Sequence, residues 1–207
     1  METFVLTYDL GTTGCKTCLY CIGQRLDLIG SALAEYPLMI TEDGGAEQAA
    51  DDWWRALCVS TREVISKTAH APDAIQGMAF CCQMQGSILV DREGRALRNP
   101  MTYMDGRAVR QMQESLCHGP LRISGLNAFK ALNTLRITGG VAATPKDPLW
   151  KYHWVRENEP EIFKQTDKWL DVKDYLILKC TGQLGMTRDS AHATFLKLFQ
   201  ILNRTWY

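Results

Sequence analysis

The stretch from Thr7 to Leu19, TYDLGTTGCKTCL, constrains the fold most, because two apolar segments flank a short loop of glycine and threonine. The segments Phe4–Asp9 and Cys15–Ile22 are typical of strands, and a third such segment extends from about Leu28 to Leu38. The connections between these segments are short, which favours antiparallel pairing. The sequence therefore predicts that the chain begins with an antiparallel meander.

The loop between the first two predicted strands contains the ingredients of a P-loop, namely Gly11, Gly14, Lys16 and Thr17. Its spacing is wrong for that motif, because Cys15 separates Gly14 from Lys16 and the segment that follows is strand-like, not helical. A hairpin turn can nevertheless hold phosphate, since glycine lets the backbone approach closely and backbone N–H groups donate to phosphoryl oxygens. We therefore expect a phosphate-binding turn without a helix.

Four side chains around this turn suit phosphate chemistry. The hydroxyls of Thr12 and Thr13 can donate to phosphoryl oxygens, and Lys16 can neutralise phosphate charge. Asp9, at the end of the first strand, suits a Mg²⁺ ion bound through water. The alternative is that the loop is only a tight turn, and the flanking aspartate and lysine favour phosphate binding over it.

The rest of the chain reads as mixed α and β structure. An amphipathic helix is predicted after the Gly-rich break TEDGGAEQ, with two aspartates at its favourable N-terminal end. Its apolar face is formed by Trp54, Leu57, Cys58, Thr61, Val64 and Ile65. We take Trp54 as a core residue and Trp53 as a rim residue that packs on an apolar ligand face. A buried strand is predicted over Ala74–Phe80, and a fifth strand over Ser87–Asp91 leads into the turn DREG.

Four further helices are predicted in the second half of the chain, near Gly106–Cys117, Pro148–Glu157, Pro160–Thr166 and Lys173–Cys180. The segment 139–148, GGVAATPKDP, is the best candidate for a mobile loop. The order β-β-β-α-β followed by helices predicts an α/β domain with a mixed five-stranded sheet, an antiparallel front and flanking helices, which is not a doubly wound fold.

Composition limits the partners of the chain. Of its 207 residues, 46% are hydrophobic, enough to bury a core, and Lys plus Arg number 23, as do Asp plus Glu. The net charge is therefore zero, which predicts no attraction of the whole molecule to nucleic acid or to an anionic membrane. Residues 1–22 lack a basic n-region, and no window approaches eighteen apolar residues in a row. We expect a cytoplasmic protein with a small-molecule partner.

Three of the eight cysteines, Cys15, Cys18 and Cys21, have the spacing of a metal-ligand set. They fall on a predicted strand, where side chains alternate between faces, so Cys18 points opposite to the other two. One metal ion cannot collect all three. We expect reduced, buried thiols.

Four motifs together resemble the FGGY family of carbohydrate kinases, in the superfamily of actin and the sugar kinases. In chain order they are DLGTTGCK (Asp9–Lys16), similar to the first phosphate motif; Glu47-Gln48 followed by Trp53-Trp54, similar to EQ-x4-WW; QMQG (Gln83–Gly86) with LRNPMTYMDGRA (Leu97–Ala108), similar to the xylulokinase-type QMHG and LRPAILWNDGR; and Asn158–Gln183, similar to the helix pair that follows. The resemblance extends to about Leu196.

This resemblance implies an actin-like ATPase (ribonuclease H-like) fold and a first, sugar-binding domain over residues 1–196. It implies ATP-dependent phosphorylation of a sugar hydroxyl, with ATP and Mg²⁺ as cofactors and a pentulose such as xylulose, or a related ketose or polyol, as substrate. By position, Asp9, Gly11, Thr12, Thr13 and Lys16 would meet phosphate and Mg²⁺, with Asp9 on the metal side. The predicted sugar-binding residues are Gln83, Met84, Gln85, Asp105 and Arg107. Asp105 and Arg107 could instead simply pair with each other.

The chain also departs from the family pattern. Gln85 stands where the xylulokinase-type motif has histidine, which puts D-xylulose itself in doubt. The GGGD-like segment with the general base, which opens the second domain of the family, is absent from residues 1–207, and the tail at 197–207 is atypical. We therefore expect little activity from these residues alone. The alternatives are a non-catalytic sugar-binding or regulatory module and half of a split kinase, with a separate second domain or a homodimer as partner.

Overall fold

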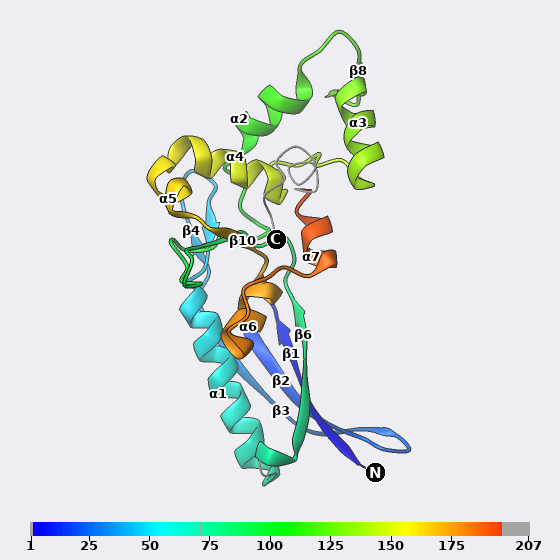
Figure 1. Cartoon of the computed structure of the whole chain (residues 1–207), viewed down its shortest axis with the longest axis vertical. Helices are drawn as coiled ribbons and strands as arrows, with labels where there is room; N and C mark the ends of the chain where they lie inside the picture. The colour runs from blue at the N-terminus through cyan, green and yellow to red at the C-terminus, as the bar shows by residue number, and fades with distance from the viewer. Residues whose placement is uncertain (1, 71, 196–207) are drawn as a thin grey trace. The chain divides into compact units, whose positions relative to one another are not determined.

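A computed structural model describes residues 2–70 and 72–195 of the protein (Figure 1). Its chain divides into two compact units. Unit 1 comprises Met1–Leu38 and Gln48–Gln83, and unit 2 comprises Met39–Glu47 and Met84–Tyr207. The predicted atypical tail at 197–207 lies outside the described residues. None of the described helices is both long enough and apolar enough to cross a membrane.

Unit 1 is built on a mixed sheet with the strand order β3-β2-β1-β6 (Figure 1). The strands are β1 (Thr3–Leu10), β2 (Gly14–Ile22), β3 (Leu26–Glu35) and β6 (Ile75–Cys82). β2 pairs antiparallel with both β1 and β3, whereas β6 runs parallel to β1. The predicted antiparallel meander is therefore confirmed, and the parallel fourth strand makes the sheet mixed.

Helix α1 (Ala50–Thr68) packs against β2 and β3 of this sheet. Asp51 and Asp52 in its first turn and Lys67 in its last turn complement the helix dipole. Along its length the helix buries Trp53, Ala56, Leu57, Ser60 and Val64, which recur at the spacing of one helical face. This face anchors the helix to the sheet.

Our assignment of the two tryptophans is wrong. Trp53 is the core residue, with 0% of its surface exposed, and Trp54 is only half-buried. The sequence interpretation weighed the large apolar residues alone and left out Ala56 and Ser60, which belong to the buried face. Including these small residues turns the face by about 100°, the angle that one residue advances along a helix.

Two strand predictions also need correction. β6 is not a buried strand: its residues are half-buried or exposed, and it lies at an edge of the sheet. The predicted fifth strand exists as β7 (Ile88–Val90) but does not join this sheet. It pairs antiparallel with β10 (Lys168–Leu170) in unit 2, so the mixed sheet has four described strands where we expected five.

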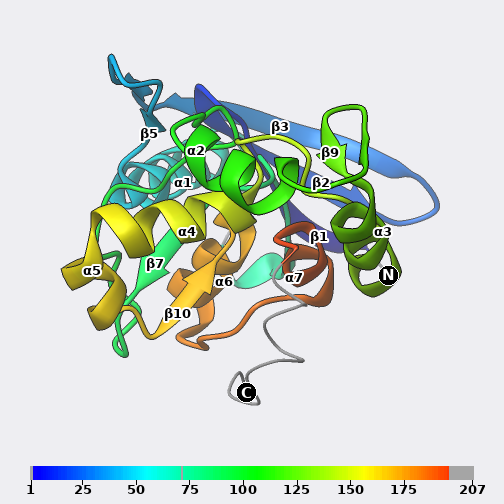
Figure 2. The ribbon, with the colours of Figure 1, turned by 90° about the horizontal axis from the view of Figure 1, so that it is seen from above.

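Unit 2 contains the predicted helices as α2 (Val109–Met112) with the π-helical turn η2 (Gln113–Cys117), α4 (Pro148–Asn158), α5 (Pro160–Gln165) and α6 (Val172–Thr181). Figure 2 shows α4 and α5 beside β7 and β10. A buried cluster lies there, formed by Leu89 of β7, Val155 of α4 and Met101 from the segment that follows β7. Ile162 and Phe163 of α5 pack against it. The second half of the chain therefore has a core of its own.

The remaining elements of the described chain are short. They are β4 (Met39–Ile40), β5 (Ala46–Glu47), β8 (Arg122–Ile123), β9 (Leu126–Asn127), the 3₁₀ turn η1 (Pro72–Ala74), α3 (Ala128–Thr138) and α7 (Arg188–Ala193). The sequence interpretation missed α3 and α7. The segment 139–148 is irregular up to the start of α4, as expected, and its mobility stays a prediction.

Candidate functional site

The loop between β1 and β2 is a tight turn that unit 1 holds by its carbonyl groups. The N–H of Gly11 donates to the carbonyl oxygen of Gly14 across the turn, at 3.0 Å. The hydroxyl of Tyr36 lies 2.5 Å from Gly11 O and 3.1 Å from Gly14 O, and the backbone N–H of Tyr36 donates to Thr13 O at 3.2 Å. One buried tyrosine thus orients three of the turn's carbonyl groups.

The fourth carbonyl group of the turn is held by a buried amide. Gln48 Nε2 donates to the carbonyl oxygen of Thr12 at 2.7 Å, and Gln48 is 0% exposed. All four carbonyl oxygens of Gly11–Gly14 therefore accept hydrogen bonds from within unit 1. Since these negative ends of the peptide dipoles are engaged by the protein, they do not oppose an anion that approaches the N–H side of the turn.

The charged residues that flank the turn lie directly opposite each other on the hairpin. Asp9 on β1 is paired in register with Lys16 on β2, and both side chains are exposed. Thr12 is half-buried and Thr13 is exposed at the tip. The structure thus brings all five predicted phosphate-side residues, Asp9, Gly11, Thr12, Thr13 and Lys16, to one hairpin end.

The donor set at this hairpin fits Mg²⁺ only with help from phosphate. The described residues contain no cluster of three or more metal-ligating side chains. Mg²⁺ in phosphoryl-transfer sites commonly uses one or two carboxylates together with waters and substrate phosphates. A single exposed carboxylate, that of Asp9, meets that requirement without a protein cage.

Gln83 lies in unit 1, just beyond the end of β6. Its backbone N–H donates to Leu10 O at 2.7 Å, which continues the pairing with β1. Its side-chain Nε2 donates to Gln48 Oε1 at 2.7 Å. Its Oε1 is buried and finds no hydrogen-bond partner among the described residues. Gln83 therefore carries an unused acceptor.

The other predicted sugar-binding residues belong to unit 2. Met84 is 67% exposed and is therefore not a core residue. Gln85 has a left-handed backbone with φ +60, an unusual conformation for a residue other than glycine. Its side-chain Nε2 donates to Asp147 Oδ1 at 3.1 Å, and its carbonyl oxygen accepts from Lys151 Nζ at 2.9 Å. These two contacts hold the backbone of Gln85 in place.

Lys151 on α4 is buried, with 0% exposed, and donates to two carbonyl oxygens, those of Gln85 at 2.9 Å and Thr102 at 2.7 Å. Burial lowers the pKa of the Lys151 amine to about 8, although three nearby carboxylates act in the opposite direction. A neutral amine still has two N–H groups, which match the two carbonyl oxygens. The link between α4 and the QMQG segment therefore survives either protonation state.

Asp171, the N-cap residue of α6, holds the next residue of the segment. Its Oδ1 accepts the backbone N–H of Gly86 at 3.0 Å and that of Val172 at 2.7 Å. Burial raises the pKa of the Asp171 carboxyl from 3.8 to about 6, against the effect of these N–H groups. A Cβ atom on Gly86 would lie 2.5 Å from Val172 Cγ2, so only glycine fits this close approach.

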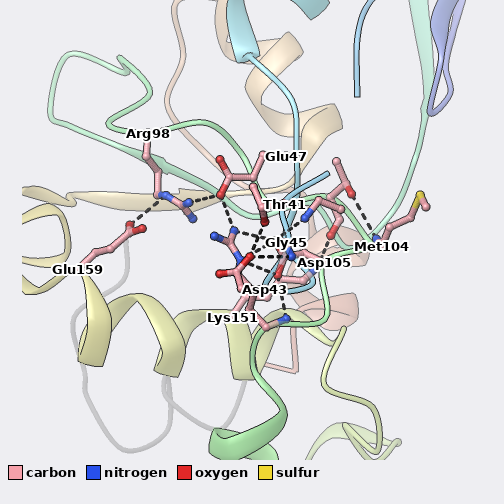
Figure 3. A network of polar contacts seen from close by, with 12 residues as sticks. Thr41, Asp43, Gly45, Glu47, Arg98, Met104, Asp105, Lys151 and Glu159 are labelled. Atoms are coloured by element: carbon pink, nitrogen blue, oxygen red, sulfur yellow. Dashed lines mark hydrogen bonds and ion pairs between the residues drawn. The ribbon is translucent and has the colours of Figure 1, made fainter. Parts of the chain in front are cut away.

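Asp105 and Arg107 pair with each other inside a larger network, drawn in Figure 3. Arg107 Nη2 lies 2.7 Å from Asp105 Oδ2 and 2.5 Å from Glu47 Oε1, and Asp105 is 1% exposed. Asp105 Oδ2 also accepts the backbone N–H of Ala46 at 3.0 Å. The guanidinium of Arg107 stacks 4.5 Å from the ring centroid of Trp154.

The network continues from Glu47 to a second arginine. Arg98 Nη2 lies 2.5 Å from Glu47 Oε1, and Arg98 Nε lies 3.0 Å from Glu159 Oε2 (Figure 3). The alternative that Asp105 and Arg107 pair with each other is thus what the described residues display. A contact with sugar through their remaining hydrogen-bonding capacity stays a prediction.

Sequence reasoning missed several residues that hold these segments in place: Tyr36 and Gln48 in unit 1, and Asp147, Lys151 and Asp171 in unit 2. It named Trp53 but gave it the wrong role. The two aspartates precede helices, so N-cap preference was a signal that could have found them. Gln48 belongs to the Glu47-Gln48 motif, and nothing in that motif indicates a contact with the turn. Tyr36 gives no local signal, because its hydroxyl acts on residues more than twenty positions earlier in the chain.

Comparison with known proteins gives a consistent result. Residues 4–207 match the model of the N-terminal domain of the FGGY family of carbohydrate kinases. A xylulose kinase of Bacillus subtilis is 28% identical over 206 residues, which cover 98% of this chain and 38% of that protein. A gluconokinase of Bacillus licheniformis is 25% identical, with 100% of this chain and 37% of that protein covered.

Solved structures agree with this match. A xyloylose kinase from Brucella ovis superposes with a TM-score of 0.80 and 28% identity, covering 93% of this chain and 36% of that one. A gluconate kinase from Lactobacillus acidophilus superposes with a TM-score of 0.78 and 25% identity, covering 95% of this chain and 37% of that one. The chain thus spans well under half the length of these relatives. It has the actin-like ATPase fold and belongs to the FGGY family of carbohydrate kinases, whose N-terminal domain it matches.

Proposed function

We propose that this chain is the sugar-binding and phosphate-binding domain of a kinase that transfers the γ-phosphate of ATP to a sugar hydroxyl. The observation that carries the proposal is the family match over residues 4–207. The relatives named above are a xylulose kinase and a gluconokinase, which supports a polyhydroxy substrate. The proposed substrate is a pentulose such as xylulose, or a related ketose or polyol.

In this proposal the hairpin end of unit 1 meets the phosphate groups. The Gly11 N–H already donates to Gly14 O, so the other backbone N–H groups of the turn and the hydroxyls of Thr12 and Thr13 donate to phosphoryl oxygens. Lys16 offsets the charge of the phosphate. Asp9 would hold a hydrated Mg²⁺ ion, which neutralises phosphate charge when it is bound. The support for these roles is that Tyr36 and Gln48 engage all four carbonyl oxygens of the turn.

The proposed sugar-side residues are Gln83, Met84, Gln85, Asp105 and Arg107. Amide, carboxylate and guanidinium groups offer the donors and acceptors that polyols require. The proposed domain extends over residues 1–196, and the general base comes from residues outside it, in a second domain or a partner chain. Because both ATP and phosphorylated sugars are handled inside the cell, we also propose a cytoplasmic location.

Calorimetric titration tests the proposal. The purified chain is titrated with D-xylulose, D-ribulose, xylitol and D-gluconate, and separately with inorganic tripolyphosphate in the presence of Mg²⁺. We expect saturable heat for at least one sugar or polyol and for tripolyphosphate. Asp9→Asn and Lys16→Met should each weaken tripolyphosphate binding about 3- to 10-fold, since each loses a charged contact.

Lys67→Met is the matched control for the lysine, because Lys67 is exposed near the end of α1 and pairs only with its helix neighbour Glu63 among the described contacts. It should leave binding unchanged. Sugar binding without tripolyphosphate binding would instead indicate a sugar-binding module. Absence of binding to every sugar and polyol tested would refute the proposed function, whether or not tripolyphosphate binds.

A further inference from the structure

A chain of three side chains in unit 1 has only one consistent hydrogen-bond arrangement. Trp53 Nε1 donates to Gln48 Oε1 at 3.1 Å, Gln48 Nε2 donates to Thr12 O at 2.7 Å, and Gln83 Nε2 donates to Gln48 Oε1 at 2.7 Å. Trp53 and Gln48 are both 0% exposed. We call these three side chains, Trp53, Gln48 and Gln83, the amide relay.

The hydrogen bonds that Gln48 makes with Trp53 and with Thr12 fix the orientation of its side-chain amide. An indole N–H can only donate, and a backbone carbonyl oxygen can only accept. If the amide of Gln48 were rotated by half a turn, two donors would meet at Trp53 and two acceptors would meet at Thr12. The oxygen of Gln48 must therefore face Trp53 and its nitrogen must face the turn.

This orientation dictates that of Gln83. Because Gln48 presents its oxygen, Gln83 must direct its nitrogen toward Gln48, and its own Oε1 is left on the other side of the amide. That oxygen is buried and has no partner among the described residues. Buried polar atoms in folded proteins are nearly always hydrogen-bonded, so this oxygen calls for a partner from outside the described residues.

We propose that the relay makes Gln83 a dedicated hydrogen-bond acceptor for a substrate hydroxyl, and that Gln48 and Trp53 are positioning residues that enforce this polarity. The inference rests on the proposed function and names the chemistry at one point of the ligand. A hydroxyl satisfies Gln83 Oε1, whereas a carbonyl or carboxylate oxygen at the same point would meet it as a second acceptor. Gln48 also holds Thr12, so one amide orients both the phosphate turn and the acceptor.

The test is a cycle between protein and ligand variants, measured by calorimetry on the full chain. The ligands are D-xylulose and a set of deoxyfluoro analogues, each with one hydroxyl replaced by fluorine, which cannot donate. The protein variants are Gln83→Met, which removes the acceptor at similar size, and Gln76→Met, the same change at an exposed position of β6.

We expect one analogue to bind the unmodified chain at least about tenfold more weakly than D-xylulose. That same analogue should bind the Gln83→Met chain no more weakly than D-xylulose does, because the acceptor it fails to satisfy is gone. Gln76→Met should behave as the unmodified chain. If every analogue loses the same affinity relative to D-xylulose, in the unmodified chain and in the Gln83→Met chain alike, the inference is overturned.

The positioning role is tested with the neighbouring tryptophans. Trp53→Phe keeps an aromatic ring but removes the indole N–H, and Trp54→Phe is the control outside the relay. Side-chain amide resonances of the isotope-labelled chain report on Gln48 and Gln83 without any ligand. We expect Trp53→Phe to increase amide exchange at Gln48 and Gln83 about tenfold or more and to remove the preference for hydroxyl over fluorine, with no such change in Trp54→Phe.

The two proposals fail in distinguishable ways. If the unmodified chain binds none of the sugars, the proposed function and the ligand role of Gln83 are both refuted, while the amide resonances still decide whether the relay exists. If sugars bind and Gln83→Met leaves the affinity for D-xylulose and for all analogues unchanged, the proposed function stands and this inference is wrong. Should Trp53→Phe fail to fold, Gln83→Met decides the acceptor role alone.

Discussion

The hydroxyl of Tyr36 provides a direct test of how the phosphate turn is held. Tyr36 is 6% exposed, and its single hydroxyl proton is shared between Gly11 O at 2.5 Å and Gly14 O at 3.1 Å. Burial raises the pKa of this hydroxyl, so it remains a donor throughout the neutral range. Tyr36→Phe removes the donor and nothing else.

The cost follows from which acceptor is left without a partner. Gly14 O keeps the N–H of Gly11, whereas Gly11 O loses its donor in a nearly buried setting. A buried acceptor without a partner costs about 1–3 kcal/mol. We therefore expect the free energy of unfolding to fall by about 1–2 kcal/mol, measured by urea titration followed by circular dichroism.

Tyr20→Phe is the matched control, because Tyr20 lies half-buried on β2 of the same sheet and its hydroxyl makes no hydrogen bond among the described contacts. It should change the free energy of unfolding by less than about 0.5 kcal/mol. Equal effects of the two substitutions would refute the claim that Tyr36 holds the turn. A loss of tripolyphosphate affinity in Tyr36→Phe but not in Tyr20→Phe would further support it.

Three other predictions concern unit 2. Gly86→Ala places a Cβ 2.5 Å from Val172 Cγ2 and should cost about 1–3 kcal/mol in urea titrations, whereas Gly77→Ala, whose Cβ meets nothing within 4 Å, should cost much less. The pKa of Asp171 is raised, so the folded chain binds the proton of this carboxyl more tightly than the unfolded chain does. The free energy of unfolding should therefore fall by about 3 kcal/mol as the pH rises from 3.8 to about 6. Asp171→Asn should flatten that part of the plot of unfolding free energy against pH. Arg107→Lys loses the planar contact with two carboxylates, which should lower the free energy of unfolding by about 2–4 kcal/mol and the midpoint of thermal unfolding by several degrees. An unchanged midpoint would contradict the network of Figure 3.

The parts of the fold that follow from local sequence were predictable. The meander follows from alternating segments with short connections, and α4, α5 and α6 follow from apolar spacing and starting prolines or aspartates. Helix α3 was missed although its signals are present: Asn127 caps it by accepting two backbone N–H groups, and Gly139 ends it in a left-handed conformation. Capping signals therefore deserved as much weight as apolar periodicity.

The parts that depend on distant pairing were not predictable. β6 and β7 read alike as apolar segments, yet β6 joins β1 at a sheet edge and β7 pairs with β10. At the site, the sequence indicated the hairpin residues because they are adjacent in the chain. The relay from Trp53 through Gln48 to Gln83 joins residues up to 35 positions apart, and only the structure displays it.

Resonance mapping with the isotope-labelled chain tests the central claim most directly. Titration with Mg²⁺ and tripolyphosphate should shift backbone amide resonances at Gly11–Gly14, and titration with D-xylulose or another ketose or polyol should shift those at Gln83–Gln85 and at Asp105 and Arg107. Saturable shifts confined to these residues and their neighbours are the predicted result. Absence of shifts with every sugar tested, or shifts confined to other residues, would contradict the assignment of this chain as the sugar-binding and phosphate-binding domain of a carbohydrate kinase.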